Sequence, residues 1–396
     1  MVDFSLNETD QKILEEVKKL AKATEKNSRY WDEHEEEVRH MGQKAPEAEA
    51  FSYIFDMMKD RDKKEGACSP MLYQMTQSMN QGLGDGLMSI MSGQRNWALG
   101  NASLQAAGTP EQQAKWGNTL LAMANTEPGC GSDSKAIETT AVLDGDEWVL
   151  NGEKIFVTTG ILCQGVVVWA TIDKSAGRGG IKSFVVMKGT PGFQLEKKEK
   201  KLGIRSSDTA AFVLKNCRIP RENLLGLDEE VKQKGGGGFK GLMRTFNMTR
   251  PMVSAGGIGN VNAAYDFVQE AMKKEGVEMN WEAGPLKRTS IQDKMIELES
   301  QIQAASLSTL RAAWLAEKGQ PNNLESAMCK SKGGEISRTG AQLAIELLGA
   351  LGITQDQLVE KAFRDARITD IYEGTGEINR LVVARAILGY TSEDLM

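Results

Sequence analysis

The order of the hydrophobic patterns along the chain is the feature that most constrains its fold. Helix-like periodicity fills the first part, short β-branched and aromatic runs such as EWVLNGEKIFVTTG and VVVWATIDK fill the middle, and helix-like periodicity then returns. No βαβ alternation occurs. The pattern predicts an α+β multidomain protein with an N-terminal all-α domain over residues 1–122, a middle antiparallel β-barrel or sandwich over 123–233, and a C-terminal helical domain over 239–396.

Several local signals fit this division. Residues 9–24 repeat apolar side chains on one face, which indicates an amphipathic helix. Thr109-Pro110 is typical of an N-cap followed by proline at the first helical position. The four glycines at 235–238 predict a flexible joint before the C-terminal domain. An apolar stripe at i, i+4, i+7 and i+11 predicts a further long helix through Ile291, Met295, Leu298 and Ile302.

Composition and charge exclude several classes of function. The 396 residues carry a formal net charge of −6, whereas a nucleic-acid surface needs a basic excess. No run of 18 apolar residues occurs, so no membrane span is expected. The opening MVDFSLNETD lacks the features of a signal peptide, and the five cysteines are scattered without metal spacing. We therefore expect a cytoplasmic protein with reduced thiols.

The histidines narrow the chemistry further. Only His34 and His40 are present, both in the charged stretch WDEHEEEVRH, which is typical of a solvated helix face. A Ser-His-Asp mechanism and a metal site are therefore not expected. Gly257-Ile-Gly259 follows no predicted strand and lacks a third glycine, so a dinucleotide-binding Rossmann domain is not expected either.

Two segments of the β region combine polar groups with conformational freedom. The loop Ala124–Asp133 (ANTEPGCGSD) suits either a turn-rich linker or a surface that approaches a flat polar ring. In KIFVTTG, Phe156 and Thr158 share one face of a predicted strand. They are either ordinary strand residues or groups that cover a ring and donate a hydrogen bond to it.

Two C-terminal segments leave similar alternatives. In FNMTRP, Arg250 precedes Pro251 and is either a structural ion-pair partner or a ligand to an anion. In IYEGTGEINR, Thr375 is a candidate N-cap and Glu377 falls in the first helical turn. Glu373 and Glu377 are then both surface residues at a helix start. The alternative is that Glu373 is a catalytic base.

Taken together, five segments resemble the acyl-CoA dehydrogenase family in their order, over about residues 90–390: TEPGCGSD, KIFVTTG, FNMTRP, LLGALG and FRDARITDIYEGTGEINRLVVARAILG. The resemblance implies that the helical domain and β-barrel are followed by a four-helix bundle. It implies FAD held between barrel and bundle, in a homotetramer that is a dimer of dimers. The reaction it implies introduces a trans 2,3-double bond into an acyl-CoA thioester, with an electron-transfer flavoprotein as acceptor.

The resemblance assigns the catalytic base to Glu373. This carboxylate would remove the α-proton while the β-hydride passes to flavin N5, which gives a 2,3-enoyl-CoA. The substrate carbonyl oxygen would accept hydrogen bonds from the Glu373 N–H and a flavin ribityl hydroxyl. Some members carry the base on the helix of FNMTRP, where this chain has Thr249, which cannot serve.

The remaining site residues carry over from the same resemblance. Contacts with the substrate are expected from Ser132, Asn247, Arg250 and Gly374. Contacts with FAD are expected from Thr126, Gly131, Ser132, Phe156, Val157, Thr158, Glu346, Leu347, Gly349, Ala350, Thr375 and Glu377. Many members have tryptophan at the position of Phe156.

The chain departs from the family at two further places. Members usually carry an Arg-x-x-Phe-Gly segment that reaches a neighbouring subunit's FAD, but residues 277–288 read VEMNWEAGPLKR. Trp281 is a candidate replacement for the aromatic side chain, and Lys287 or Arg288 for the charge. The usual glutamine before the LLGALG loop is Glu346.

The acyl group is suggested by one unusual helix. GLMSIMSGQRNWALGNASLQ should line the acyl pocket, and a buried Arg95 would need an anion. We therefore expect a carboxylate- or ring-bearing substrate, such as a substituted succinyl-CoA (benzylsuccinyl-CoA) or a glutaryl-type CoA, unless Arg95 faces solvent. Two alternatives remain: a flavoprotein of this fold with another reaction (oxidase, reductase or desulfinase), and a non-catalytic scaffold that has lost FAD.

Overall fold

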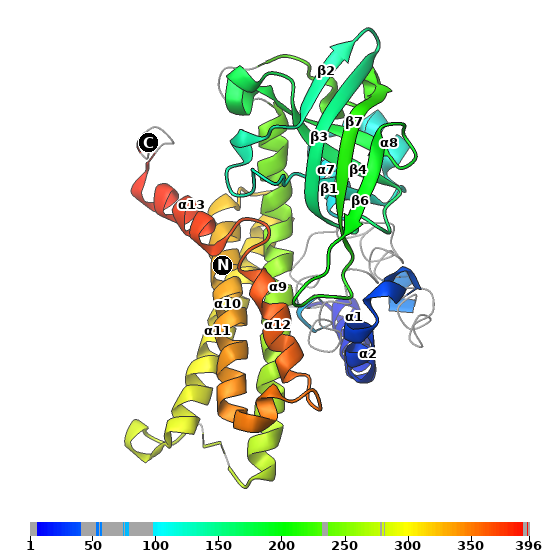
Figure 1. Cartoon of the computed structure of the whole chain (residues 1–396). Helices are drawn as coiled ribbons and strands as arrows, with labels where there is room; N and C mark the ends of the chain where they lie inside the picture. Colours follow the sequence, from blue (N-terminus) through cyan, green and yellow to red (C-terminus); the bar gives the residue numbers. More distant parts are fainter. Residues whose placement is uncertain are drawn as a thin grey trace.

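The chain folds into helices on either side of one β unit. The computed structural model describes residues 6–40, 53, 54, 56, 57, 74, 76–78, 98–231, 237–277, 279, 280, 282–390 and 394. Helices precede and follow seven strands in these ranges, in the order that the sequence predicts (Figure 1). The predicted domain limits themselves stay a prediction.

The described N-terminal helices follow their sequence signals. Helix α1 (Glu8–Thr24) begins at Asn7, whose side chain accepts a hydrogen bond from the Asp10 N–H at 2.8 Å, and it buries Ile13 and Val17 completely. Helix α8 (Pro110–Trp116) has the expected N-cap, because Thr109 accepts from the Gln112 N–H at 3.3 Å. Helices α2 (Ser28–Glu33) and α7 (Leu99–Ala107) also belong to the described N-terminal part.

The middle unit is a curled seven-stranded sheet with a buried apolar interior. Trp148 and Phe184 meet edge to face there, with ring centroids 5.2 Å apart. The strand order is β1-β4-β2-β3-β7-β6, with β5 paired to β4. The strands are β1 (Leu121–Ala124), β2 (Thr140–Asp144), β3 (Glu147–Thr158), β4 (Gly165–Thr171), β5 (Ile181–Met187), β6 (Phe193–Lys198) and β7 (Thr209–Pro220).

The strand directions correct one detail of the prediction. The sheet is not wholly antiparallel, because β4 runs parallel to both β1 and β2. In the chain, the β2–β3 hairpin lies between β1 and β4, and β3 lies between β2 and β4; such long connections permit parallel pairing, whereas a tight hairpin does not. The β2–β3 and β4–β5 pairs are antiparallel, as predicted for this unit.

The C-terminal part is a bundle built around one long helix. Helix α9 (Gly237–Lys274) packs against the sheet at one end and inside the bundle at the other (Figure 1). Its partners are α10 (Ser290–Glu317), α11 (Asn323–Leu348) and α12 (Val359–Thr369), and α13 (Gly376–Leu388) leaves the bundle at an angle. The predicted stripe on α10 is buried at Met295, Leu298 and Ile302, whereas Ile291 lies at the exposed end.

Two of the four glycines predicted to form a flexible joint are helical instead. Gly237 and Gly238 already belong to α9, and residues 232–236 lie outside the described ranges. A Cβ added to Gly238 would lie 2.1 Å from the Ile181 carbonyl oxygen. Only glycine therefore lets the start of α9 lie directly against β5.

Proline inside α9 leaves a carbonyl that another helix satisfies. Pro251 has no N–H, so the Asn247 carbonyl, four residues earlier, lacks its helical partner. The Asn322 side chain, at the N-cap of α11, donates to this carbonyl at 3.2 Å. Helix α11 therefore supports the segment that carries Thr249 and Arg250 at the turn where Pro251 removes a helical hydrogen bond.

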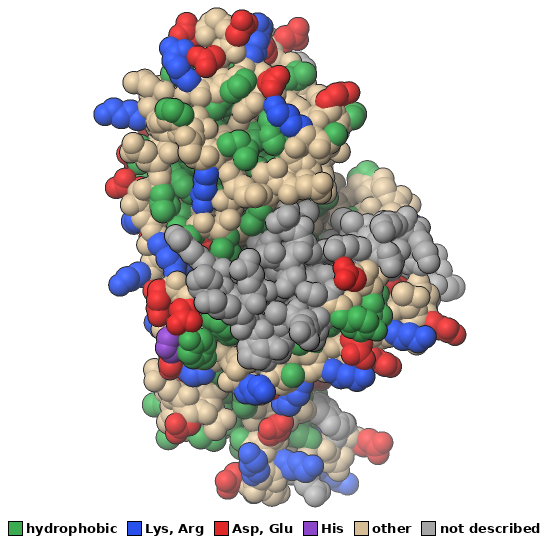
Figure 2. Space-filling model, turned by 90° about the vertical axis from the view of Figure 1, so that its right-hand side faces the viewer, with side chains coloured by type: hydrophobic (Ala, Val, Ile, Leu, Met, Phe, Trp, Pro, Cys, Tyr) green, Lys and Arg blue, Asp and Glu red, His purple; other side chains and the backbone are tan. Residues whose placement is uncertain are grey.

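The described surface mixes charges of both signs. Figure 2 shows acidic and basic side chains interspersed over the visible face rather than gathered by sign. No helix in the described ranges combines the length and apolar character that a membrane crossing requires.

A charged network ties the N-terminal helices to α12. Arg364 donates to both carboxylate oxygens of Asp32, at 3.0 and 2.6 Å, and Asp32 is 2 % exposed. Arg364 also pairs with Glu360 at 2.8 Å, and Arg29 contacts Glu360 at 2.5 Å. Burial opposes ionisation of Glu360, but the hydrogen bonds from Arg364 and Arg29 outweigh it and lower its pKa.

The Arg364→Gln variant should lose about 2 kcal/mol of unfolding free energy, because it leaves Asp32 and Glu360 with fewer partners in a partly dehydrated site. The matched control is Arg218→Gln, which breaks exposed ion pairs with Asp144 and Glu147 and should cost much less. Urea denaturation of both variants measures the difference. Equal losses would contradict the prediction.

Candidate functional site

Glu373 lies in a strained turn between α12 and α13. Its φ is 58°, in the left-handed region that non-glycine residues seldom adopt, and Gly374 follows with φ 88°. Thr375 caps α13, because its hydroxyl accepts from the Ile378 N–H at 3.2 Å. The predicted N-cap is therefore confirmed, and the turn bends Glu373 away from the helix that follows.

The turn is held by α9. The Thr249 hydroxyl lies 2.6 Å from the Glu373 Oε2, and Arg250 Nε donates to the Glu373 carbonyl at 3.1 Å. A Cβ on Gly374 would lie 3.4 Å from Arg250 Nη2, and the buried Asn379 donates to the Gly374 carbonyl at 2.8 Å. The structure therefore brings together Glu373, Gly374 and Arg250, which the sequence predicted for one site.

The electrostatic surroundings leave the Glu373 carboxyl poised for proton transfer. Glu373 keeps part of its surface open, but the dense protein around it removes hydration and raises its pKa. The Thr249 hydrogen bond and the positive charges of Arg250 and Lys330 act in the opposite direction. Burial also lowers the pKa of Lys330, to about 8. A carboxyl whose pKa is raised above its ordinary range suits a general base near neutral pH.

The loop after β1 is fixed by a buried ion pair. Lys154 Nζ lies 2.6 Å from the Glu127 Oε1, with side-chain exposures of 0 % and 4 %. Glu127 also accepts from the N–H groups of Glu138 at 2.7 Å and Thr139 at 3.1 Å. The Ile155 N–H donates to the Thr126 carbonyl, so the loop lies against β3. Burial opposes ionisation of Glu127, but Lys154 prevails and lowers its pKa.

The exposed face of β3 beside this loop suits a flat ring. Phe156 is 60 % exposed with φ 55°, at a register shift between Lys154 and Val157. Thr158 is partly exposed on the same face, and Gly131 has open space around it. An open aromatic side chain, a hydroxyl and a glycine loop together fit a flavin. Val157 is fully buried, so neither its side chain nor its backbone is accessible to a ligand.

The other predicted residues fall into separate groups. Ser132 is exposed in the loop, and the Asn247 Oδ1 accepts from Ser326 at 3.2 Å. Glu346 is exposed, beside Leu347, Gly349 and Ala350 at the far end of α11. Eleven residues of α12 separate that end from the Glu373 turn, a length of about 16 Å. Glu377 is exposed, and Arg95 lies outside the described residues.

Residues 277–288 are the segment in which the chain departs from the family pattern. Of the two candidate cations there, Arg288 already has local partners. Arg288 donates to the Ala283 carbonyl at 2.7 Å and lies 3.7 Å from Asp293, so its guanidinium is engaged locally. Lys287 is exposed, and Leu286 next to it is fully exposed. Trp281 lies outside the described residues.

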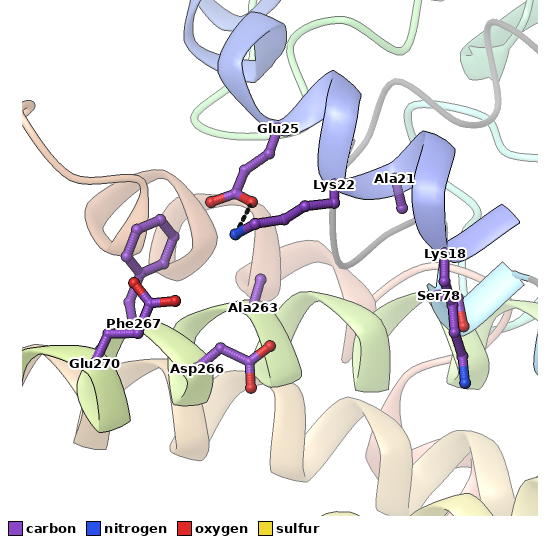
Figure 3. A pocket seen from close by; sticks show the side chains of 9 residues that line it. All are labelled: Lys18, Ala21, Lys22, Glu25, Ser78, Ala263, Asp266, Phe267 and Glu270. Atoms are coloured by element: carbon purple, nitrogen blue, oxygen red, sulfur yellow. Dashed lines mark ion pairs between the residues drawn. The ribbon is translucent and has the colours of Figure 1, made fainter. Parts of the chain in front are cut away.

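A hollow between α1 and α9 is a separate feature. It measures about 370 Å³ and is lined by charged side chains of both signs, with an ion pair of 2.7 Å between Lys22 and Glu25 (Figure 3). Its α9 residues begin at Ala263, fourteen positions beyond Thr249, or about 21 Å along the helix. The hollow is therefore distinct from the Glu373 site.

Two family models match the chain. The model described as "Acyl-CoA dehydrogenase, middle domain" matches residues 122–217, and "Acyl-CoA dehydrogenase, C-terminal domain" matches residues 236–388. The mitochondrial short-chain specific acyl-CoA dehydrogenase of Mus musculus is 40 % identical over 288 residues, covering 71 % of this chain and 67 % of the relative. The chain belongs to the acyl-CoA dehydrogenase family.

Other members of the family extend the comparison. Acryloyl-CoA reductase (NADH) of Anaerotignum propionicum is 37 % identical over 289 residues, 71 % of each chain. The butyryl-CoA dehydrogenase structure from Megasphaera elsdenii superposes with a TM-score of 0.81 at 27 % identity, covering 98 % of this chain and all of that one. A structure described for the electron transferring flavoprotein of Acidaminococcus fermentans gives the same TM-score at 31 % identity and the same coverage.

Family membership establishes several sequence predictions. The acyl-CoA dehydrogenase fold, with its helical ends and middle β unit, is confirmed, and so is an oxidoreductase that uses FAD. The residues missed by sequence reasoning are Glu127, Lys154 and Lys330. Lys154 lies in a strand, Lys330 in a helix and Glu127 in a loop, and in none of these does the local sequence distinguish a buried charge from an exposed one.

The Lys154→Met variant should lose about 3 kcal/mol of unfolding free energy and should release FAD more readily, because it leaves Glu127 buried without its cation. The matched control is Lys115→Met, since Lys115 pairs with Glu222 at the same 2.6 Å distance but in solvent. Chemical denaturation and dialysis with flavin absorbance measure both effects. A Lys154→Met protein as stable as the control would contradict the buried-pair assignment.

Proposed function

We propose that this protein dehydrogenates an acyl-CoA thioester at its 2,3-bond, with Glu373 as the base that removes the α-proton. The observation that carries the proposal is the carboxyl itself. It lies in a strained turn, its pKa is raised by burial, and it faces the Thr249 hydroxyl at 2.6 Å. Nothing in the cap of α13 requires this carboxyl, because Thr375 supplies that cap.

The residues of the chain divide the chemical work. The Glu373 carboxylate takes the α-proton, and its backbone N–H donates to the thioester oxygen, which stabilises the charge that develops there. Arg250 fixes the turn through the Glu373 carbonyl, so the carboxyl and the N–H keep their relative positions. When bound, FAD supplies the hydride acceptor.

The cofactor contacts are proposed for two groups of residues. We assign Thr126, Gly131, Ser132, Phe156 and Thr158 to the flavin end, supported by the exposed Phe156 and the open space around Gly131, whereas the fully buried Val157 offers no surface for this role. Thr375 and Glu377 are assigned to the ADP half. Glu346, Leu347, Gly349 and Ala350 lie about 16 Å from the Glu373 turn along α12, and we assign them to the FAD of a second copy of the chain.

A homotetramer agrees with that arrangement. Helix α13 exposes Leu381, Ile387 and Leu388 at 53–68 %, an apolar face that a second copy would cover. An electron-transfer flavoprotein is the proposed acceptor, as the described Acidaminococcus structure suggests. A cytoplasmic location is part of the same proposal.

A reductase is the second candidate. The acryloyl-CoA reductase of Anaerotignum propionicum is 37 % identical and is named for the reverse direction. In that direction protonated Glu373 would return the proton to the α-carbon. Reduction of the flavin by NADH with a partner flavoprotein, measured against reduction by acyl-CoA, separates the two directions.

Replacing Glu373 by Gln should lower the rate of flavin reduction by butyryl-CoA at least about a thousandfold, because the amide cannot accept the α-proton. The wild-type rate should fall as the pH drops through the raised pKa of Glu373, since only the carboxylate is a base. Stopped-flow bleaching of the flavin measures both. Bleaching that survives in Glu373→Gln at neutral pH would reject the assignment.

The substrate class depends on Arg95. We propose a carboxylate- or ring-bearing acyl group, and Arg95→Ala should then lose activity with glutaryl-CoA and benzylsuccinyl-CoA by about tenfold or more while keeping activity with butyryl-CoA. Steady-state kcat/KM with the three thioesters measures the preference. Equal losses on all three would show that Arg95 does not recognise the acyl group.

A further inference from the structure

Thr249 stands where its single hydroxyl hydrogen has two possible acceptors. The hydroxyl oxygen lies 2.6 Å from the Glu373 Oε2 and 3.1 Å from the Thr245 carbonyl oxygen, one turn earlier on α9. Thr249 is 1 % exposed and Thr245 is fully buried, so water is largely excluded from both. A hydroxyl has one hydrogen and two lone pairs, and it therefore donates to only one of these oxygens at a time.

We propose that Thr249 is the positioning residue of the base and that its hydroxyl changes partner with the charge of Glu373. This inference rests on the proposed function. When Glu373 is a carboxylate, the hydroxyl donates to Oε2, because a charged acceptor outcompetes a neutral carbonyl. When Oε2 holds the proton, the roles reverse: Glu373 donates to the Thr249 oxygen, and the Thr249 hydrogen turns to the Thr245 carbonyl.

The change of partner needs only rotation of the O–H bond. All three oxygens keep their places, and no donor is left without an acceptor in either state. This matters because an unpaired polar group in a dehydrated site is costly. The carboxyl can therefore remain in one position before and after it takes the proton.

The two hydrogen-bonding states also show how Thr249 affects the protonation of Glu373. Among the described residues, the charged groups that act on Glu373 are Arg250 from α9 and Lys330 from α11. Both positive charges favour the Glu373 carboxylate, and the Thr249 hydroxyl favours it further by donating a hydrogen bond to it. Removing that donor leaves the same burial with less compensation, so the base should hold its proton to higher pH.

The test uses the full-length, FAD-loaded enzyme and butyryl-CoA. In Thr249→Val, the acid limb of the rate of flavin reduction should move up by about one pH unit, the size expected for one hydrogen bond to a charged group. The rate should be about tenfold lower below that limb and approach the wild-type rate above it. Thr249→Ser keeps the hydroxyl and should restore the wild-type profile.

The matched control is Thr245→Val. It removes another buried threonine hydroxyl from the same helix, one that donates to the Gly241 carbonyl and not to Glu373. Its acid limb should not move. A shift in this control equal to that in Thr249→Val, or an unshifted acid limb in Thr249→Val, would overturn the inference.

A second measurement does not depend on turnover. The infrared band of the protonated Glu373 carboxyl, assigned by its loss in Glu373→Gln, should persist to higher pH in Thr249→Val. If Thr249→Val binds no FAD, Thr249→Cys replaces it, because a thiol is a weak donor and should shift the limb in the same direction; an unshifted limb there overturns the inference. Activity retained in Glu373→Gln would reject the proposed function. If Glu373→Gln is inactive but the acid limb of Thr249→Val does not shift, only the role of Thr249 is rejected.

Discussion

The dehydration of one carboxyl group is the constraint on which the site depends. Taking an ionised glutamate out of water is unfavourable unless charges or hydrogen bonds replace its hydration. At Glu373 these come from three directions: the Thr249 hydroxyl, the Arg250 guanidinium and the Lys330 ammonium group. They lessen the rise in pKa without abolishing it, which leaves a carboxyl that is neither a permanent anion nor a permanently protonated acid.

Helix α9 connects the Glu373 site to the sheet at one end and to the bundle at the other. Its first glycines lie against β5, its middle turn holds Thr249 and Arg250, and its last turns form the bundle core. Pro251 removes one helical hydrogen bond beside the site, and Asn322 of α11 donates to the Asn247 carbonyl that is left without its helical partner. Strand β5 and the Glu373 turn are therefore both held by one helix, although they lie far apart in the sequence.

Much of the fold could be read from the sequence because its signals are local. The cap at Thr109, the strand runs and the stripe through Met295 depend on neighbours within a few residues. The Thr375 cap could be predicted for the same reason. The partner of Glu373 was not: Thr249 attracted notice only as a residue unable to act as the base, and its contact with Oε2 joins residues 124 positions apart. The parallel pairings of β4 and the buried pair of Glu127 with Lys154 depend on similarly distant segments, which periodicity cannot bring together.

The left-handed backbone at Glu373 has a consequence for how such proteins change over time. Glycine adopts this conformation without the steric cost that a side chain incurs, about 1 kcal/mol or more. Drift toward glycine at this position would therefore relax the turn while removing the proposed base. In a relative whose base occupies this position, loss of the carboxyl should therefore leave the stability of the fold unharmed, so a stable fold does not by itself imply an active enzyme.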